Sequence, residues 1–148
     1  MLHINRQTRQ NFLSIIEKLS IEQLNHIPQG YNNNILWNYA HVIVTQQLLT
    51  YGLSQLPLTL DADIVSAFRK GSKPERSYSE TELENFKALA NTTLDQFETD
   101  KAAGLFSTFK AYPTSFGIRL HSLEEAEAFN NVHEALHLGV VMNMRRLV

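Results

Sequence analysis

The sequence of 148 residues contains no cysteine, only four prolines and a single tryptophan. The lack of cysteine excludes disulfides, thiolate nucleophiles and cysteine-ligated metal sites, which leaves histidine and carboxylate chemistry. Charges nearly balance at a net −2, so no basic surface points to nucleic acid or to an anionic membrane. No apolar run approaches the roughly 20 residues that span a bilayer, and residues 1–12 lack the apolar stretch of a signal peptide. We therefore expect a cytoplasmic protein without nucleic-acid or membrane partners.

Hydrophobic periodicity indicates a helical protein. Apolar residues make up 43% and charged residues 19% of the chain, a composition typical of a globular domain with a substantial core. Apolar residues recur at helical spacing in four long segments, which predicts an all-α fold: a single domain, residues 1–148, forming a four-helix bundle with long crossover connections. The expected long helices cover residues 5–19, 32–54, 79–103 and 122–146, and shorter helical turns are expected at residues 20–24 and 61–69.

Serine residues mark the beginning of three of these segments. In each case Gln or Glu follows three residues later, the spacing of a capping box, in which each side chain bonds the backbone amide of the other. Residues 105–121, before the last long helix, carry β-like and turn residues, so we expect them to cross the bundle as an extended loop. The three capping pairs are Ser20 with Gln23, Ser79 with Glu82, and Ser122 with Glu125.

The stretch Asn131–His137, NVHEALH, contains two histidines four residues apart. In a helix, His133 and His137 differ in direction by about 40°, so both imidazoles project from one face. That face also carries Ala126 and Met144, which predicts that the pair lies on the buried seam of the helix. A buried imidazole needs a partner, since an unpaired polar group costs on the order of 1–3 kcal/mol. Two readings follow: the histidines bind a metal ion, or they are core histidines bonded to neighbouring side chains.

His41 is the candidate for a third ligand, because it lies inside the most apolar of the predicted helices. If that helix lies beside the last one, three histidines meet at one point and leave open coordination positions, as in a catalytic zinc site. Taken alone, His41 would be a core histidine with a satisfied partner. The residues expected to line the surrounding pocket are Asn34, Trp37, Asn38, Thr45 and Asn130.

The remaining histidines are His3 near the N-terminus, His26 in a turn and His121 just before a helix cap. We expect all three to be surface or loop residues, as solvent-facing polar residues usually are. The alternative places His121 near the mouth of a site.

The letters HEALH also match H-E-x-x-H, the zinc-binding helix of many metalloproteases. Such a protease needs a further ligand, usually downstream, but the eleven residues after His137 include no His, Asp or Glu. No convincing set of strands precedes the motif either, so the sequence disfavours a protease. Glu134 points about 80° away from the mean direction of the two histidines. It is either a catalytic base beside a metal or, as we favour, a solvated or bundle-edge carboxylate.

The positions of the histidines resemble those of the DinB-like superfamily of metal-binding four-helix bundles. The matching segments are LWNYAHVIVTQQLL around His41 and FNNVHEALHLGVV around His133 and His137. Gly139 also fits the family pattern, whereas Val140 stands where members commonly have Gln. The resemblance covers the whole chain in the order and length of its elements. It implies that the three histidines hold a divalent metal, usually zinc or nickel, with water completing the coordination.

Characterised members of the superfamily include S-transferases that act with bacillithiol or mycothiol, and a maleylpyruvate isomerase. By this resemblance the chain is a metal-dependent enzyme, transferase-like or hydrolase-like, that takes a small-molecule substrate or a low-molecular-weight thiol. Two alternatives stay open: a non-catalytic metal- or ligand-binding domain, and a structural helical protein with core histidines. Under each of them we expect a homodimer, because strongly apolar helices leave an exposed stripe.

Overall fold

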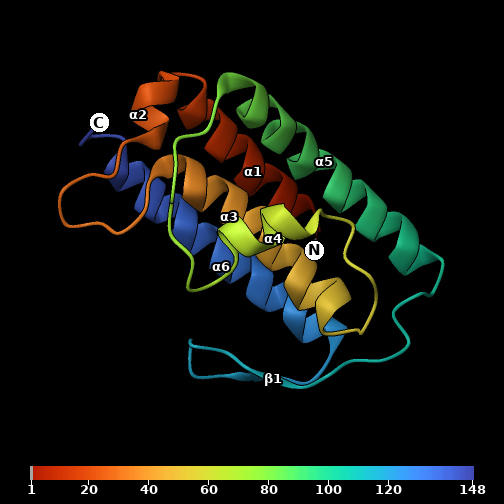
Figure 1. The fold of residues 1–148 in the computed structure, drawn as a ribbon. Coiled ribbons are helices and arrows are strands. Elements are labelled where there is room, and N and C mark those ends of the chain that lie inside the picture. The colour runs from red at the N-terminus through yellow and green to blue at the C-terminus, as the bar shows by residue number, and fades with distance from the viewer. Residues whose placement is uncertain (1) are drawn as a thin grey trace.

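A computed structural model describes residues 2–148 and shows a mostly helical chain (Figure 1). This confirms the all-α class expected from the sequence. A π-helical turn, η1 (Leu48–Gly52), continues the third helix, and two short strands, β1 (Tyr112–Pro113) and β2 (Arg119–Leu120), pair antiparallel. Within the described residues, no helix is long and apolar enough to cross a membrane. The helices are α1 (Leu2–Ile16), α2 (Ile21–Asn25), α3 (Ile35–Gln47), α4 (Ala62–Phe68), α5 (Glu80–Ala102) and α6 (Leu123–Met144).

Side-chain caps account for where several helices begin. Ser20 and Ser79 each form the expected capping box, in which serine and the residue three positions later bond each other's backbone amides. Ser122 caps α6 by accepting from the Glu125 amide at 3.3 Å. The Glu125 carboxylate accepts from the amide of His121 at 2.7 Å, so the returning bond reaches the residue before the cap.

The four longest helices pack around one core. α1 contacts both α5 and α6, and α3 contacts the same two helices, so the four form a closed ring of neighbours. Figure 1 shows these helices running side by side. The largest cluster of buried side chains draws on all four, with Phe12, Val42, Phe86 and Val141 among its members. Removal of this apolar surface from water is the main force that holds the ring together.

α3 is covered on nearly all sides. All of its residues except Thr45 are buried, so its polar side chains need partners inside the protein. Asn34 caps the helix by accepting from the amide of Trp37 at 2.8 Å. At its other end the helix widens into η1, where the Leu53 amide donates to the Leu48 carbonyl oxygen at 3.1 Å, five residues back. The long helix expected in this region is therefore an α-helix with a π-helical end.

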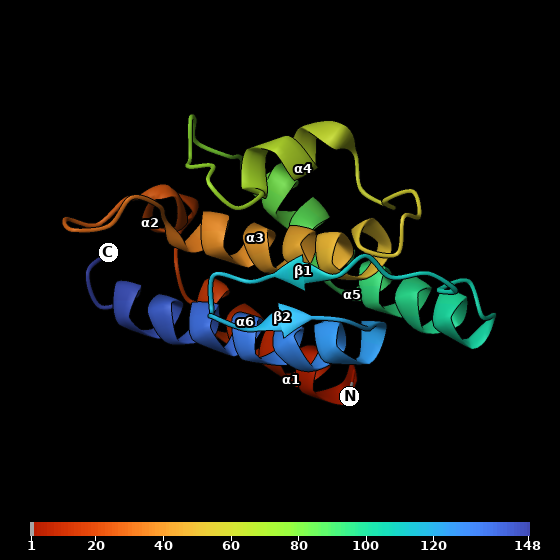
Figure 2. The ribbon, with the colours of Figure 1, turned by 90° about the horizontal axis from the view of Figure 1, so that it is seen from below.

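Two segments outside the ring cover α3 and α6. α4 packs on α3, and the β1–β2 hairpin packs on η1 and α6, where Leu120 is buried with Leu49 and Ala126 (Figure 2). The extended loop expected at residues 105–121 is thus wrong in part, because its second half forms a hairpin. Gly117 lies in the turn of that hairpin with φ of +88°, a conformation that glycine adopts without steric cost. These two segments complete the walls of the candidate site.

Candidate metal centre

Three histidines from two helices meet where α3 faces α6. His41 comes from α3, whereas His133 and His137 lie one turn apart on α6. One ring nitrogen of each histidine lies within 4.8 Å of those of the other two. The ring centroids are between 4.6 and 5.2 Å apart. The structure therefore brings together the three residues that the sequence nominated as metal ligands.

The C-terminal end of α4 fixes the ring of His41. Its Nδ1 lies 2.6 Å from the Phe68 carbonyl oxygen, which can only accept, so Nδ1 carries the proton and donates it. Nε2 is then the unprotonated nitrogen, and the Thr45 hydroxyl lies 3.3 Å from it. The indole of Trp37 stacks on the imidazole, with centroids 4.4 Å apart and planes 11° apart. These contacts set both the tautomer and the direction of His41, as partners of metal-binding histidines do.

The side chain of Asn38 on α3 fixes the tautomer and the direction of His137. The Nδ1 of His137 lies 2.7 Å from Asn38 Oδ1. The Asn38 amide nitrogen is occupied, since it donates to the Asn34 carbonyl oxygen at 2.7 Å. Asn38 therefore accepts through its oxygen, Nδ1 of His137 carries the proton, and Nε2 is left as a lone-pair donor.

His133 holds a buried nitrogen without a protein partner. In the described part of the chain, its Nδ1 is buried and makes no hydrogen bond. A buried polar atom in that state costs on the order of 1–3 kcal/mol. A bond from this nitrogen to a metal ion would supply the missing partner. Three neutral imidazoles are a donor set that suits zinc, nickel, copper and iron alike, so the residues fit a divalent metal ion.

Burial keeps the three imidazoles neutral. Desolvation, together with charge repulsion from the neighbouring imidazoles, lowers the pKa of His133 to about 3 and that of His137 to about 4. The pKa of His41 is also lowered, mainly by burial, although its bond to the Phe68 carbonyl opposes the shift. Neutral imidazole is the form that binds a metal. At neutral pH all three histidines are therefore in their ligand form.

A cavity of about 710 Å³ opens beside the histidines, and all three of them line it. This volume lies in the range of sites that hold small organic molecules. Its walls come from α3, η1, the turn after α4, the hairpin and α6. Most of the lining is apolar, and this apolar wall consists of Trp37, Leu48, Leu49, Leu53, Phe129 and Leu136.

The five residues expected to line the pocket divide into two groups. Trp37 and Thr45 do line the cavity. Asn34, Asn38 and Asn130 are each at most 2% exposed and are not among the residues that line it. Helical periodicity placed Asn34 and Asn38 on the side of α3 that carries His41. It could not show that hydrogen bonds to backbone groups and to His137 would bury both side chains.

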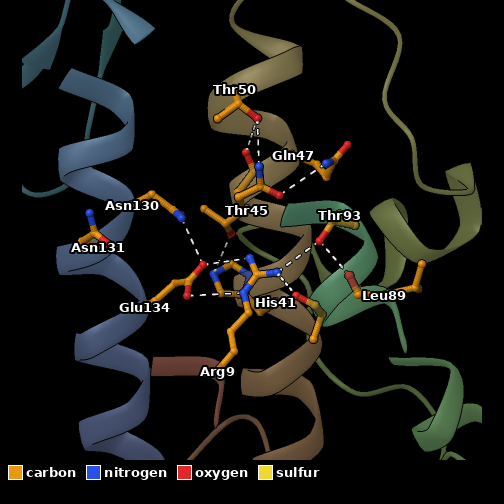
Figure 3. A network of polar contacts seen from close by, with 12 residues as sticks. Arg9, His41, Thr45, Gln47, Thr50, Leu89, Thr93, Asn130, Asn131 and Glu134 are labelled. Carbon is orange, nitrogen blue, oxygen red and sulfur yellow. Dashed lines mark hydrogen bonds and ion pairs between the residues drawn. The ribbon is translucent and has the colours of Figure 1, made fainter. Parts of the chain in front are cut away.

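Glu134 is neither solvated nor at the edge of the helix ring, which corrects the sequence reading. Its side chain is 0% exposed and forms an ion pair with Arg9, whose Nη2 lies 2.9 Å from Oε1. Asn130 Nδ2 donates to the same oxygen at 3.0 Å. Glu134 lies outside the residues that line the cavity, which leaves the catalytic-base reading without geometric support. Figure 3 shows the carboxylate between Asn130 and the Arg9 guanidinium.

Arg9 joins three helices of the ring through this network (Figure 3). Its Nη1 donates to the Ala90 carbonyl oxygen at 2.7 Å and to the Thr93 hydroxyl at 3.1 Å. The side chain of Arg9 is 1% exposed. The network links α1 through Arg9, α5 through Ala90 and Thr93, and α6 through Glu134. These bonds restrict rotation of α6 about its own axis, which keeps His133 and His137 directed toward the cavity. A buried arginine in α1 gave no signal in the helical periodicity.

Sequence reasoning missed two other contributors to the site. The Phe68 carbonyl that accepts from His41 is a backbone group, so no residue type in the sequence indicates this contact. Lys70 lies just after the short helix expected at residues 61–69, and the hairpin residues Tyr112, Thr114 and Ser115 reach the cavity from the segment expected to be an extended loop. The short helix predicted at residues 61–69 gave an indirect signal for the Phe68 carbonyl, because a helix in that position must pack against another part of the protein.

The remaining histidines behave as expected. His3, His26 and His121 are all exposed. His3 lies within α1. His121 directly precedes the cap of α6.

Comparison with known families agrees with this geometry. A model of the DinB superfamily matches residues 4–141, a range that includes all three histidines. No curated protein matches the chain. The family match covers nearly the whole sequence, and the chain therefore belongs to the DinB superfamily.

Proposed function

We propose that this chain is a metal-dependent enzyme in which His41, His133 and His137 hold a divalent cation, zinc or nickel, at the wall of a ligand-sized cavity. The observation that carries the proposal is the convergence of three neutral imidazoles, with one ring nitrogen each within 4.8 Å, beside a cavity of about 710 Å³. Three protein ligands leave positions open, as in catalytic zinc sites. We also infer that the ring of α1, α3, α5 and α6 is the four-helix bundle of the superfamily.

A divalent cation at this site would lower the pKa of a thiol or a water molecule and so supply a nucleophile at neutral pH. The residues of the chain orient the ligands and shape the space around them. Phe68 and Asn38 hold two of the imidazoles in one tautomer. The Thr45 hydroxyl, 3.3 Å from His41 Nε2, would become free to donate to a bound anion once that nitrogen binds the metal. The apolar wall strengthens these electrostatic interactions by excluding water. This arrangement supports thiol transfer to a small molecule, or hydrolysis of one.

Metal content tests the first part of the proposal. Protein prepared without a histidine tag and dialysed against zinc should hold one equivalent, measured by elemental analysis. His137→Ala should hold none, because two imidazoles leave the cation short of a ligand. The matched control is His121→Ala, which removes an exposed histidine and should retain the full equivalent. A His137→Ala protein that is folded and still binds one zinc would contradict the three-histidine site.

Spectroscopy of the cobalt-substituted protein distinguishes a thiol-binding enzyme from a water-activating one. A thiolate on cobalt gives a charge-transfer band in the near ultraviolet, and a thiol transferase should show it on titration with a small thiol. A hydrolase-like site should leave that region unchanged and should instead cleave a panel of small esters. If neither the band nor hydrolysis is observed with fully loaded protein, the non-catalytic binding domain becomes the better account.

We further propose that the chain forms a homodimer through the outer face of α6. Val132 and Met142 are 43% and 48% exposed along this face. Between Glu125 and Arg145 the charged residues of the helix are both buried, so two copies of this face can meet without charge repulsion. Light scattering should give twice the monomer mass, and the double variant with Val132→Lys and Met142→Lys should give the monomer mass. A monomeric natural protein would refute the dimer without affecting the metal site.

A further inference from the structure

We propose that the cavity takes an amphipathic organic anion, whose apolar body lies against the apolar wall and whose anionic group meets Lys70. This deepens the proposed function and rests on it in one respect, namely that the same cavity receives the substrate. Three features carry the inference: the charge inside the cavity, the position of the Lys70 backbone, and the composition of the rest of the lining.

Positive charge in the cavity lacks a negative partner among the described residues. Lys70 is the one Lys, Arg, Asp or Glu in that lining, so no carboxylate faces it there. Glu134 cannot compensate, because its carboxylate is buried outside the lining and is paired with Arg9 at 2.9 Å. A divalent cation on neutral imidazoles would add two more positive charges. An anionic ligand balances this charge, whereas a cationic ligand is repelled by it.

Lys70 stands at a fixed place relative to the histidines. Phe68, two residues earlier, accepts from His41, so the Lys70 backbone lies at most about 7 Å along the chain from that contact. The turn is also held from the other side, because the Trp37 indole donates to the Ser72 hydroxyl at 3.1 Å. The same indole stacks on His41 at 4.4 Å. Through these bonds, the turn that carries Lys70 and the imidazole that faces the cavity form one connected unit.

Apart from Lys70 and the histidines, the cavity offers mainly apolar surface. The indole of Trp37, the ring of Phe129 and the leucines of η1 and α6 make up most of it. A small inorganic anion would leave this surface wet, and a volume of about 710 Å³ is large for such an ion. A molecule with an apolar body and one anionic end satisfies both the wall and the charge.

Titration calorimetry with a matched set of probes tests the inference. The probes are 4-phenylbutyrate, its uncharged amide and 4-phenylbutylamine, which share one apolar body and differ in charge. Each is titrated into metal-free and into zinc-loaded protein. We expect the carboxylate to bind about three- to fivefold more tightly than the amide, which is the effect of one partly exposed charge contact, and the amine to bind most weakly.

Three variants assign the preference to its cause. Lys70→Gln should bring the carboxylate and the amide within twofold of each other in metal-free protein, while the amide binds as before. Lys73→Gln is the matched control, because it removes an exposed lysine three residues away that lies outside the lining, and it should keep the preference. Leu136→Ser, at the exposed rim of the apolar wall, should weaken carboxylate and amide by the same factor.

The outcomes separate this inference from the proposed function. Equal binding of carboxylate and amide by the natural protein overturns the inference, as does an undiminished preference in Lys70→Gln or a failure of all three probes to bind. None of these results bears on the zinc stoichiometry. Conversely, a carboxylate preference that depends on Lys70 in metal-free protein supports the inference even if no metal binds and the proposed function fails.

Discussion

Replacement of Glu134 by glutamine tests whether this residue supports the fold or the chemistry. Glu134→Gln keeps the shape of the side chain and one hydrogen-bond acceptor but removes the negative charge. The Arg9 guanidinium, 1% exposed and 2.9 Å from the carboxylate oxygen, is then left buried without a counter-charge. Loss of one partner of a buried ion pair costs about 3–5 kcal/mol. For a chain of 148 residues this corresponds to a fall in melting temperature of about 10–15 °C.

Chemical denaturation at pH 7 measures the stability of the variant, and elemental analysis of the same samples measures its zinc content. The matched control is Glu98→Gln, because Glu98 pairs with Arg6 at 3.0 Å but on the surface, with side chains 64% and 35% exposed. That pair should contribute less than about 1 kcal/mol. We expect Glu134→Gln to be destabilised and yet to bind a full equivalent of zinc while it is folded.

Two results would refute this reasoning. A Glu134→Gln protein within about 1 kcal/mol of the natural stability would show that the ion pair does not carry the charge balance described above. A stable variant that has lost zinc would show that Glu134 belongs to the metal site after all. The double variant with Arg9→Met and Glu134→Leu separates the two further, because removal of both charges should restore part of the lost stability.

Three further predictions concern the histidines directly. Asn38→Leu removes the acceptor that orients His137 and should weaken zinc binding about 10- to 100-fold in competition with a chelating dye, whereas Asn91→Leu, on the exposed face of α5, should not. The single tryptophan, Trp37, stacks on His41, so its fluorescence should change on titration with zinc and saturate at one equivalent; an unchanged emission would place the metal elsewhere. The free energy of unfolding of metal-free protein should rise between pH 4 and pH 6.5, because the pKa values of His133 and His137 are lowered to about 3 and about 4 in the folded chain, while unfolded histidines take up protons below about pH 6.5. The slope should be about 1.4 kcal/mol per pH unit for each histidine, and a flat profile over this range would contradict the burial of the pair.

The helical periodicity was sufficient to predict the parts of the structure that depend on local sequence. Serine caps and apolar spacing located the long helices, and the i, i+4 spacing put His133 and His137 on one face. The contact of His41 with that pair was a hypothesis from spacing and from family resemblance. It needed α3 and α6 to be neighbours, which no local pattern specifies.

The environment of the site depends on contacts between distant segments, and these left no local signal. The partner of Glu134 is Arg9, 125 residues away, so a charged residue on the helix was read as solvated by default. The bond from His41 to Phe68 uses a backbone carbonyl, and the hairpin enters the cavity from a segment whose turn residues indicated only a loop. Charge, burial and backbone partners in this protein are thus set by tertiary packing.

The π-helical turn η1 changes the angular phase of everything that follows it. An i→i+5 turn accommodates one residue more than an α turn, so the chain after Leu48 is rotated by about 100° relative to an uninterrupted α-helix. Leu49, Gly52 and Leu53, which follow Leu48, line the cavity in this shifted phase. Deletion of one residue from Leu49–Gly52 would restore the α-helical repeat and turn Leu53 out of the wall. The shape of the binding space is therefore encoded by the length of this turn as well as by the side chains in it.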